Sequence, residues 1–473
     1  MGFVIELGII SLSLLFIATF IIKNKNPPAI LGIYQRPNGF FYFKFIFMFT
    51  ILSLKKLGHK FRKRKQMEEI TALDRPQKLS AHPKAIDAVY FNGANKHGDY
   101  LVVGTARRKN KLVDGFLYLL VESSGFGLLE TPKLPGTALY QSEESEEFAA
   151  EGLRIEPQVP MGKWRISYEG KMKRFENRKE FVDVKIEAEW SSTLPYFNFD
   201  SDMDPWAMAT SMAYETFSRE YFQNLKANHQ THYEQHGDIK GVAIINGRSF
   251  SIEINAVRDH SFGLQREWRN FHRYGLHFVT AENGDRFNVG KICLPISFSR
   301  LTIGYVYSAE DGKIHPVRSC DLELHQHGEG GDPPEDYAFS FETGKKRYVM
   351  QVNVVHSPHF YISKDWESKV VERLCTFEIN GMKGWGAAEW QYRNVREKKL
   401  KMKLLLIVLF AIFCGSSLQL EEKENFRDSH ISFKRSSTTN GCSELQIMQC
   451  KFRKCILGAY CVNGVCKCNI PIK

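Results

Sequence analysis

Short β-prone runs separated by two-residue turns limit most strongly what this chain can fold into. Between residues 74 and 395 the runs are rich in β-branched and aromatic residues, and several alternate polar with apolar side chains. Asn-Gly and Asp-Gly pairs favour tight antiparallel hairpins, and they occur here at Asn246-Gly247, Asn283-Gly284, Asp311-Gly312 and Asn380-Gly381. Many short antiparallel strands predict a barrel or a sandwich rather than a parallel sheet.

One helix is expected to interrupt this β pattern. It should run from Pro205 to Leu225, because Asp204 is a good N-cap and proline fits the first turn of a helix. Since this helix falls near the middle of the β-rich region, we expect it to separate two barrels. The predicted fold is therefore mainly β, with a first barrel over 74–230 and a second over 231–395.

The charge of the chain is unevenly distributed. The 473 residues carry a net charge of +11. Residues 1–65 hold 11 Lys and Arg against Glu6 alone (+10), residues 66–397 hold 40 basic and 47 acidic residues (−7), and residues 398–473 hold 13 basic and 5 acidic residues (+8). Because the body is mildly acidic, no nucleic-acid partner is expected.

The N-terminal segment predicts a membrane anchor over residues 1–26. From Phe3 to Ile22 the sequence is almost continuously apolar, and a helix of that length spans the core of a bilayer. A cleaved signal peptide and a buried core helix are the alternatives. The first basic residues follow the run, so the positive-inside rule places the body in the cytosol.

A second segment, residues 40–65, predicts contact with a membrane surface. Its apolar stretch from Phe40 to Leu54 is interrupted by Lys44 and is too short to span a bilayer comfortably. A basic cluster, Lys55 to Lys65, follows it. Aromatic residues beside basic ones are typical of a helix that lies among the headgroups of anionic lipids. The alternative is a core helix followed by a solvated charged run.

The C-terminal tail differs from the body in its cysteines. Three cysteines are scattered through the body, which indicates a reduced interior, whereas six lie within the last 32 residues. These six predict a disulfide framework whose pairing the sequence leaves open, and they are Cys442, Cys450, Cys455, Cys461, Cys466 and Cys468. The cysteine-rich region over 418–473 resembles a small secreted peptide.

A signal-peptide-like segment precedes this cysteine-rich region. Residues 402–417 begin with Met402 and a lysine, continue with an apolar core, and end in small residues. We expect that two neighbouring genes have been joined in this sequence and that the tail, as a separate product, is secreted. In the alternative, residues 404–420 form a second membrane span.

Residues in the body resemble known families. His232 to Gly241, the run Arg258-Asp-His-Ser-Phe-Gly263, Arg266 and Trp268 are similar to the tandem lipocalin-like family of AttH proteins and carotenoid hydratases. Over about residues 70–395 the body more closely resembles paired domains of unknown function in arthropod phosphoenolpyruvate-synthase-like proteins, through segments 89–93, 98–107, 164–170 and 384–393.

The resemblance implies two lipocalin-like barrels that bind an apolar small molecule, or that act as an accessory module, with the barrel mouth as the expected site. The alternative is an enzyme, either a hydratase or isomerase of an isoprenoid-like substrate or the non-catalytic front half of a phosphotransferase. The ATP-grasp and phosphohistidine modules of the phosphoenolpyruvate-synthase-like group do not follow Arg393, and no P-loop occurs. We therefore expect no phosphotransfer activity.

The run from Arg258 to Gly263 and the residues just after it supply the candidate site. The predicted ligand-binding residues are Arg258, Asp259, His260, Arg266 and Trp268. Asp259 and His260 are the catalytic candidates, because adding water to an alkene needs a proton donor, and burial can keep a carboxylic acid neutral. Adjacent strand residues point to opposite faces, however, so Arg258 and Asp259 are alternatively a polar corner of the barrel, with Gly263 permitting the turn.

No cofactor and no metal site are predicted. His325 and His327 are the strongest pair of potential metal ligands outside the turn, but they lack a third ligand.

Overall fold

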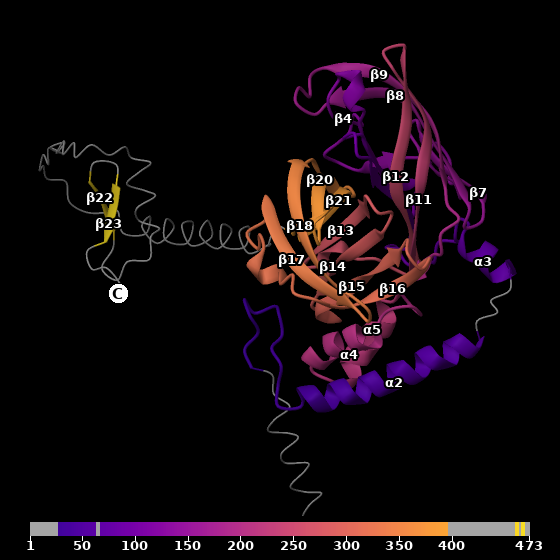
Figure 1. The fold of residues 1–473 in the computed structure, drawn as a ribbon. Helices are drawn as coiled ribbons and strands as arrows, with labels where there is room; N and C mark the ends of the chain where they lie inside the picture. The colour runs from indigo at the N-terminus through magenta and orange to yellow at the C-terminus, as the bar shows by residue number, and fades with distance from the viewer. Residues whose placement is uncertain (1–26, 63–66, 396–458, 463–464, 469–473) are drawn as a thin grey trace, which may run out of the picture. The chain divides into compact units, whose positions relative to one another are not determined.

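The structure is a computed structural model that describes residues 27–62, 67–395, 459–462 and 465–468. Over these residues the protein is mainly β, as the strand pattern predicted (Figure 1). The predicted anchor of residues 1–26, the signal-like segment 402–417 and most of the cysteine-rich region lie outside the described residues. Among the helices that are described, none combines the length and the apolar character needed to cross a bilayer.

Eight strands close into a first barrel, in which every neighbouring pair is antiparallel. The ring runs β11-β12-β1-β2-β3-β4-β8-β9, and β9 returns to β11. Its strands are β1 (Ile86–Ala94), β2 (Tyr100–Arg107), β3 (Leu112–Leu120), β4 (Leu129–Glu130), β8 (Lys163–Arg174), β9 (Phe181–Ser191), β11 (Gln230–Ile245) and β12 (Arg248–Gly263). Four short strands border the ring: β5 (Ala138–Tyr140), β6 (Phe148–Ala150), β7 (Leu153–Val159) and β10 (Phe197–Asn198).

A second closed ring of eight antiparallel strands follows. It runs in chain order except at its end, where β21 pairs with β13 and β18 pairs with β20. The strands are β13 (Arg273–Ala281), β14 (Arg286–Leu294), β15 (Phe298–Ser308), β16 (Lys313–Cys320), β17 (Asp336–Thr343), β18 (Arg347–His356), β20 (Ser368–Ile379) and β21 (Met382–Arg393), and β19 (His359–Ile362) is added to β20.

The division between the barrels lies later in the chain than the sequence suggested. Residues 231–263, expected to open the second barrel, lie in β11 and β12, which pair with β9 and β1 of the first. The long hairpin of β11 and β12 completes the first ring, and the chain enters the second ring only at Arg273. The central helix therefore interrupts the first barrel rather than separating the two.

The predicted central helix is in fact two helices, α4 (Pro205–Tyr214) and α5 (Arg219–Ala227). The N-cap is confirmed, because Asp204 accepts a hydrogen bond from the Trp206 amide at 2.7 Å. The break follows Tyr214, where Ser218 caps a new helix by accepting from the Tyr221 amide. The other helices are α2 (Phe41–Arg62), α3 (Met67–Leu73), η1 (Glu122–Ser124), η2 (Trp268–Asn270) and η3 (Leu324–Gln326).

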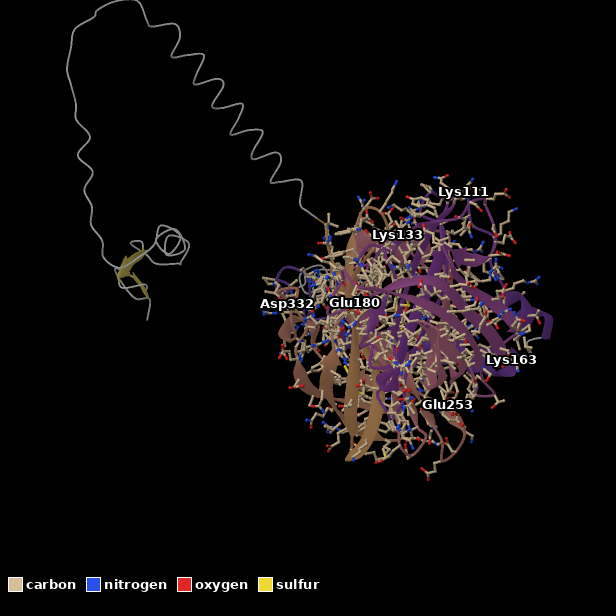
Figure 2. The ribbon with its side chains drawn as sticks, turned by 90° about the horizontal axis from the view of Figure 1, so that it is seen from above. Lys111, Lys133, Lys163, Glu180, Glu253 and Asp332 are labelled. Atoms are coloured by element: carbon tan, nitrogen blue, oxygen red, sulfur yellow. The ribbon has the colours of Figure 1, made fainter. Side chains whose placement is uncertain are left out.

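Side chains fill the interiors of both barrels. Trp164, Trp190 and Phe91 are fully buried within the first, and Trp390 and Phe287 within the second. Charged side chains such as Lys163 and Glu253 point away from the barrels into solvent (Figure 2). The packed interiors contradict the expectation of a ligand site inside a barrel mouth, because large aromatic side chains occupy that space.

Helix α2 lies along α4 (Figure 1). It packs one face, including Phe45, Met48 and Leu52, against α4 and α5. Lys44, which interrupts the apolar run in the sequence, also points inward, and its ammonium group donates to the Glu215 carbonyl at 2.7 Å. The helix expected in segment 40–65 is therefore present, and it is held by the body along one side.

The described part of the tail is a two-stranded antiparallel hairpin, β22 (Ala459–Val462) and β23 (Val465–Cys468), which pairs Cys461 with Cys466 along the backbone. The predicted disulfide framework stays a prediction.

Candidate functional site

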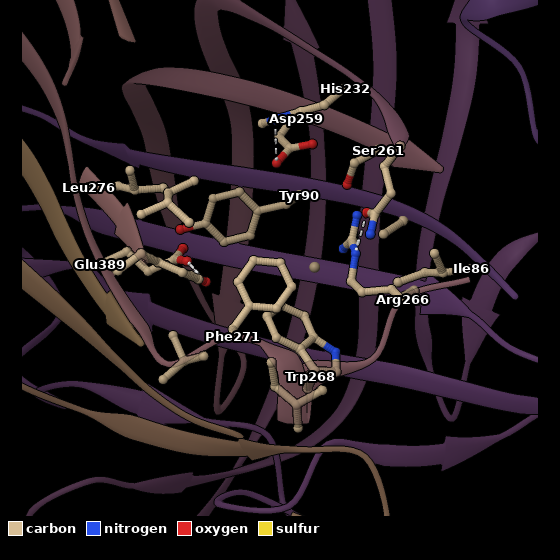
Figure 3. Close-up of a pocket in the computed structure, with 18 of the residues that line it drawn as sticks. Ile86, Tyr90, His232, Asp259, Ser261, Arg266, Trp268, Phe271, Leu276 and Glu389 are labelled. Carbon is tan, nitrogen blue, oxygen red and sulfur yellow. Dashed lines mark hydrogen bonds and ion pairs between the residues drawn. The ribbon is translucent and has the colours of Figure 1, made fainter. Parts of the chain in front are cut away.

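A cavity of about 410 Å³ lies between the two barrels (Figure 3). Strands β1, β2, β3, β11 and β12 of the first barrel contribute to one wall, and β13, β14, β15, β19, β20 and β21 contribute to the other. Most of the lining is apolar, with aromatic side chains such as Tyr90, Phe116, Phe271 and Phe278. This volume lies within the range of about 300–1,000 Å³ that small-molecule sites occupy.

Two hairpins place pairs of carboxyl groups on the walls of this cavity. The turn Asn246-Gly247 has φ values of +48° and +77°, as a type I′ turn requires, and its register sets Glu234 opposite Asp259. The turn Asn380-Gly381 has φ values of +51° and +83° and sets Glu372 opposite Glu389. All four carboxyl groups line the cavity.

The Glu372–Glu389 pair is buried and has two tyrosine partners. Glu372 is 0% exposed and accepts a hydrogen bond from the Tyr90 hydroxyl at 3.0 Å, while Glu389 accepts one from Tyr274. Burial, followed by the charge of Glu389, raises the pKa of Glu372 well above its ordinary value. Burial also raises the pKa of Glu389. The two carboxyl groups interact by a hydrogen bond, and both pKa shifts favour a proton shared within the pair.

His232 lies between the other two carboxylates. Its Nε2 is 3.1 Å from Asp259 Oδ2 and 3.4 Å from Glu234 Oε1 (Figure 3). Burial opposes its charge, but Asp259 and Glu234 outweigh burial and raise the pKa of His232 to about 10. Conversely, although burial acts to raise the pKa of Asp259, the imidazolium lowers it. Glu234, which also accepts from Asn288, has a pKa raised by burial.

His232, Glu234 and Asp259 are also the one group among the described residues that could hold a metal ion. One ligand atom from each lies within 4.8 Å of the others. An imidazole and two carboxylates suit divalent transition metals. Because its pKa is raised to about 10, His232 itself can supply a positive charge between the carboxylates.

Arg266 and Trp268, both predicted from the sequence, also line the cavity. The guanidinium group of Arg266 lies 5.6 Å from the centre of the Trp268 ring, and its Nε donates to Gln230 Oε1 at 2.6 Å. Burial, followed by the charge of Arg108, lowers the pKa of Arg266 to about 10.

Arg258 and His260 do not line the cavity. They point into the first barrel, because residues of β12 alternate between its two faces. Arg258 forms a buried ion pair with Asp74 and lies 4.9 Å from the centre of the Trp190 ring. The predicted polar corner therefore exists, but its carboxylate is Asp74 rather than Asp259.

His260 is held within the same buried network. Its Nε2 is 2.8 Å from Asp87 Oδ1, and its Nδ1 is 2.8 Å from the Tyr233 hydroxyl. Tyr233 also donates to Asp74 at 2.6 Å, which links His260 to the Arg258 ion pair. This network connects strands β1, β11 and β12 with the segment after α3, so its role is structural.

The sequence interpretation missed Glu372, Glu389, His232 and Glu234. The signal was available: a two-residue turn at Asn380-Gly381 already fixes which residues face each other across the hairpin. Two carboxyl groups directly opposite each other are unfavourable when both are charged. A glutamate pair in such a register therefore indicates a special environment.

Chemically, the cavity combines an apolar lining with groups that hold protons. The glutamate pair offers a neutral carboxylic acid, and His232 offers an imidazolium. Such groups can donate a proton to a bound molecule or orient it by hydrogen bonds.

The solved structures that are similar to the chain include the following two. One, described as an AttH protein of Nitrosomonas europaea, has 14% identity and a TM-score of 0.45, and the match covers 68% of this chain and 98% of that chain. The other, kievitone hydratase of Nectria haematococca, has 9% identity and a TM-score of 0.43, over 67% and 97%. At these identities neither likeness says what this chain binds.

A search of curated proteins finds no match to the sequence. The resemblance to phosphoenolpyruvate-synthase-like proteins stays a prediction. The model of a family of unknown function, DUF8627, matches residues 8–392, which include the N-terminal segment and both barrels but not the tail. The chain therefore belongs to the DUF8627 family of unknown function.

Proposed function

We propose that the protein binds an apolar small molecule in the cavity between its two barrels. The observation that carries this proposal is the cavity itself, an apolar space of about 410 Å³ with a few polar groups on its walls. Sites of this composition bind small molecules, since the apolar area supplies affinity and the polar groups fix orientation.

Extraction of ligand tests this proposal. The full chain is purified from cells, its bound small molecules are extracted with organic solvent, and they are identified by mass spectrometry. Ala106→Phe fills part of the cavity and should reduce the recovered ligand at least several-fold, because Ala106 lines it. Ser249→Phe, at an exposed position on β12, is the matched control and should leave recovery unchanged. A chain that carries no ligand and takes up none would contradict the proposal.

The second candidate is an enzyme of the hydratase or isomerase class acting on an isoprenoid-like substrate. The buried Glu372–Glu389 pair favours it, because a neutral carboxylic acid in an apolar cavity can protonate a bound alkene or carbonyl. Incubation of the extracted ligand with protein in heavy water distinguishes enzyme from binding protein. An enzyme would introduce deuterium, and hydration would also add the mass of one water, whereas a binding protein would return the ligand unchanged.

We also propose that α2 rests on the surface of an anionic membrane. Its outward side chains between residues 41 and 54 are, apart from Thr50, large and apolar, with Tyr42 77%, Ile46 61% and Leu54 64% exposed. No charged residue of this stretch points outward, because Lys44 is buried. The basic residues of the sequence from Lys55 to Lys65 follow, so apolar contact and attraction to anionic lipid are combined in one segment. The N-terminal anchor and the cytosolic orientation of the body stay predictions.

A further inference from the structure

Arg266 differs from the other charged groups of the cavity in its lack of a counterion. Arg108 pairs with Asp114 at 3.1 Å, His232 pairs with Asp259, and the two glutamates share a proton. For Arg266, no carboxylate within ion-pair distance is found among the described residues. Arg266 is half-buried at the wall of the cavity, and a guanidinium group that is partly withdrawn from water without a carboxylate partner favours the binding of an anion.

The position of Arg266 is fixed by its surroundings. Its amide donates to the Lys84 carbonyl at 2.9 Å, its Nε donates to Gln230, and its guanidinium group stacks on Trp268. These contacts use the Nε and one face of the group. The two terminal amino groups have no hydrogen-bond acceptor among the described residues, and the side chain projects toward Ser261 on the cavity wall (Figure 3). A guanidinium group held in this way is organised to receive two oxygens side by side.

The rest of the cavity limits which anion can bind. Glu234, Asp259 and the glutamate pair make other parts of the lining acidic, so an anion of higher charge would be repelled. Apolar side chains, including Ile86, Phe271 and Leu276, line the space beyond the guanidinium group (Figure 3). A monoanion with its charge at one end and an apolar body fits both conditions.

We propose that Arg266 binds the carboxylate of an amphipathic monoanion whose apolar part fills the cavity between the barrels. This inference rests on the proposed binding function and names the class of its ligand. At roughly 30 Å³ for each non-hydrogen atom, the cavity holds about 14 such atoms. Dodecanoate has this size and carries a carboxylate, and 2-tridecanone has the same size but no charge, so the two form a matched pair of probes.

The test measures the dissociation constants of both probes by equilibrium dialysis at neutral pH. The full chain is reconstituted in phosphatidylcholine nanodiscs, and binding to empty nanodiscs is subtracted. The wild type should bind dodecanoate at least about tenfold more tightly than 2-tridecanone. Arg266→Gln should remove this preference by weakening dodecanoate at least about tenfold while changing the ketone by less than about threefold.

Two further variants make the result specific. Arg266→Lys keeps the charge but not the paired donors, so it should retain part of the preference. Arg165→Gln is the control, because Arg165 is an exposed arginine that pairs with Glu187 at 2.8 Å outside the cavity, and it should behave as the wild type. Thermal unfolding of each variant shows that it is folded.

The remaining outcomes of the binding test would each contradict either the carboxylate assignment or the binding function. If both probes bind the wild type equally, or if Arg266→Gln weakens both to the same extent, the carboxylate assignment is wrong while the binding function stands. If neither probe binds the wild type and no ligand is recovered from cells, the binding function fails, and the role of Arg266 fails with it.

Discussion

Glu372 and Glu389 face each other across a hairpin, and in the part of the chain that the structure describes no cationic side chain forms an ion pair with either. Two charged carboxylates at this separation in a buried wall would repel each other strongly. A single shared proton turns the repulsion into a hydrogen bond, and the hydroxyls of Tyr90 and Tyr274 satisfy further oxygens. The stability of this wall of the cavity therefore depends on the protonation of the Glu372–Glu389 pair.

Glu372→Gln should change how stability depends on pH. The folded protein keeps the Glu372 proton to a higher pH than the unfolded chain, in which a glutamate ionises near pH 4.3. Unfolding above that pH releases a proton, so the free energy of unfolding falls as pH rises, by up to about 1.4 kcal/mol per pH unit, until the folded group ionises. The variant should lose this slope and gain stability relative to the wild type as pH rises. Urea unfolding at a series of pH values measures it.

The control for this prediction is Glu143→Gln, at an exposed position outside the cavity. It should leave the pH dependence as in the wild type. A Glu372→Gln protein with the wild-type slope would mean that Glu372 is ionised in the folded state.

Asp259→Asn should lower the pKa of His232. In the wild type that pKa is about 10, because Asp259 and Glu234 outweigh burial. The stabilisation from the charged imidazole is fully present below the unfolded pKa of about 6.5 and is lost as pH rises through the folded value. Removing one carboxylate should reduce the pKa by more than about one unit. Titration of the imidazole nitrogens by NMR measures the change.

Asp200→Asn is the matched control, because Asp200 pairs with another histidine, His229, at 2.8 Å. It should leave the titration of His232 unchanged. An unaltered His232 in Asp259→Asn would show that Glu234 alone, or another group, sets its protonation.

For the strands and hairpins, the sequence predicts the pairing of residues better than it predicts which of them form the site. Asn246-Gly247 and Asn380-Gly381 fix the register, and the register alone sets Glu234 opposite Asp259 and Glu372 opposite Glu389. The local sequence does not predict which face of each strand lines the cavity. That depends on the packing of one barrel against the other, between residues far apart in the chain.

The same limit explains the two errors at this scale. Residues 205–225 read as one helix because propensity does not show that Ser218 would cap a second one. Lys44 interrupts the apolar stretch in the sequence, but its side chain points inward and donates a hydrogen bond to the Glu215 carbonyl of the body. Burial lowers the pKa of Lys44 to about 8, although the negative charge of Glu215 acts to raise it.

Helix α2 carries a prediction about membranes. Residues 27–395, which include α2 but not the predicted anchor, should sediment with vesicles of phosphatidylserine and phosphatidylcholine, and at least about tenfold less with phosphatidylcholine alone. The double change Phe47→Glu and Leu54→Glu should abolish sedimentation, since both residues are exposed on the outward face. Co-sedimentation measures both effects.

Val242→Glu with Ile244→Glu is the control, because these residues are apolar and exposed on β11 rather than on α2. It should bind vesicles as the unchanged protein does. If the two double variants bind alike, the outward face of α2 does not meet the membrane. Self-association that is lost only in the α2 variant would identify a second copy as the occupant.

At the scale of the whole molecule, the chain divides where the family match ends. The chain divides into two units at residue 396, and the DUF8627 match stops at residue 392. Cysteine usage changes at the same place, from three buried free thiols in the described body to six cysteines in the last 32 residues. A reduced interior and a disulfide framework belong to different compartments, so two products explain these observations more simply than one.

We therefore propose that Met402 begins a separate product, and transcript sequencing tests this. Reads that cross the region encoding residues 393–402 should be absent, or far rarer than reads that cross residues 263–273, where the chain passes from one barrel to the next. The second junction is the internal control, because the two rings share one cavity and belong to one product. A continuous message with equal coverage at both junctions would establish a single chain. In that case residues 404–420 would be the segment to test as a second membrane span, since only a crossing there would carry six cysteines from the cytosol to an oxidising compartment.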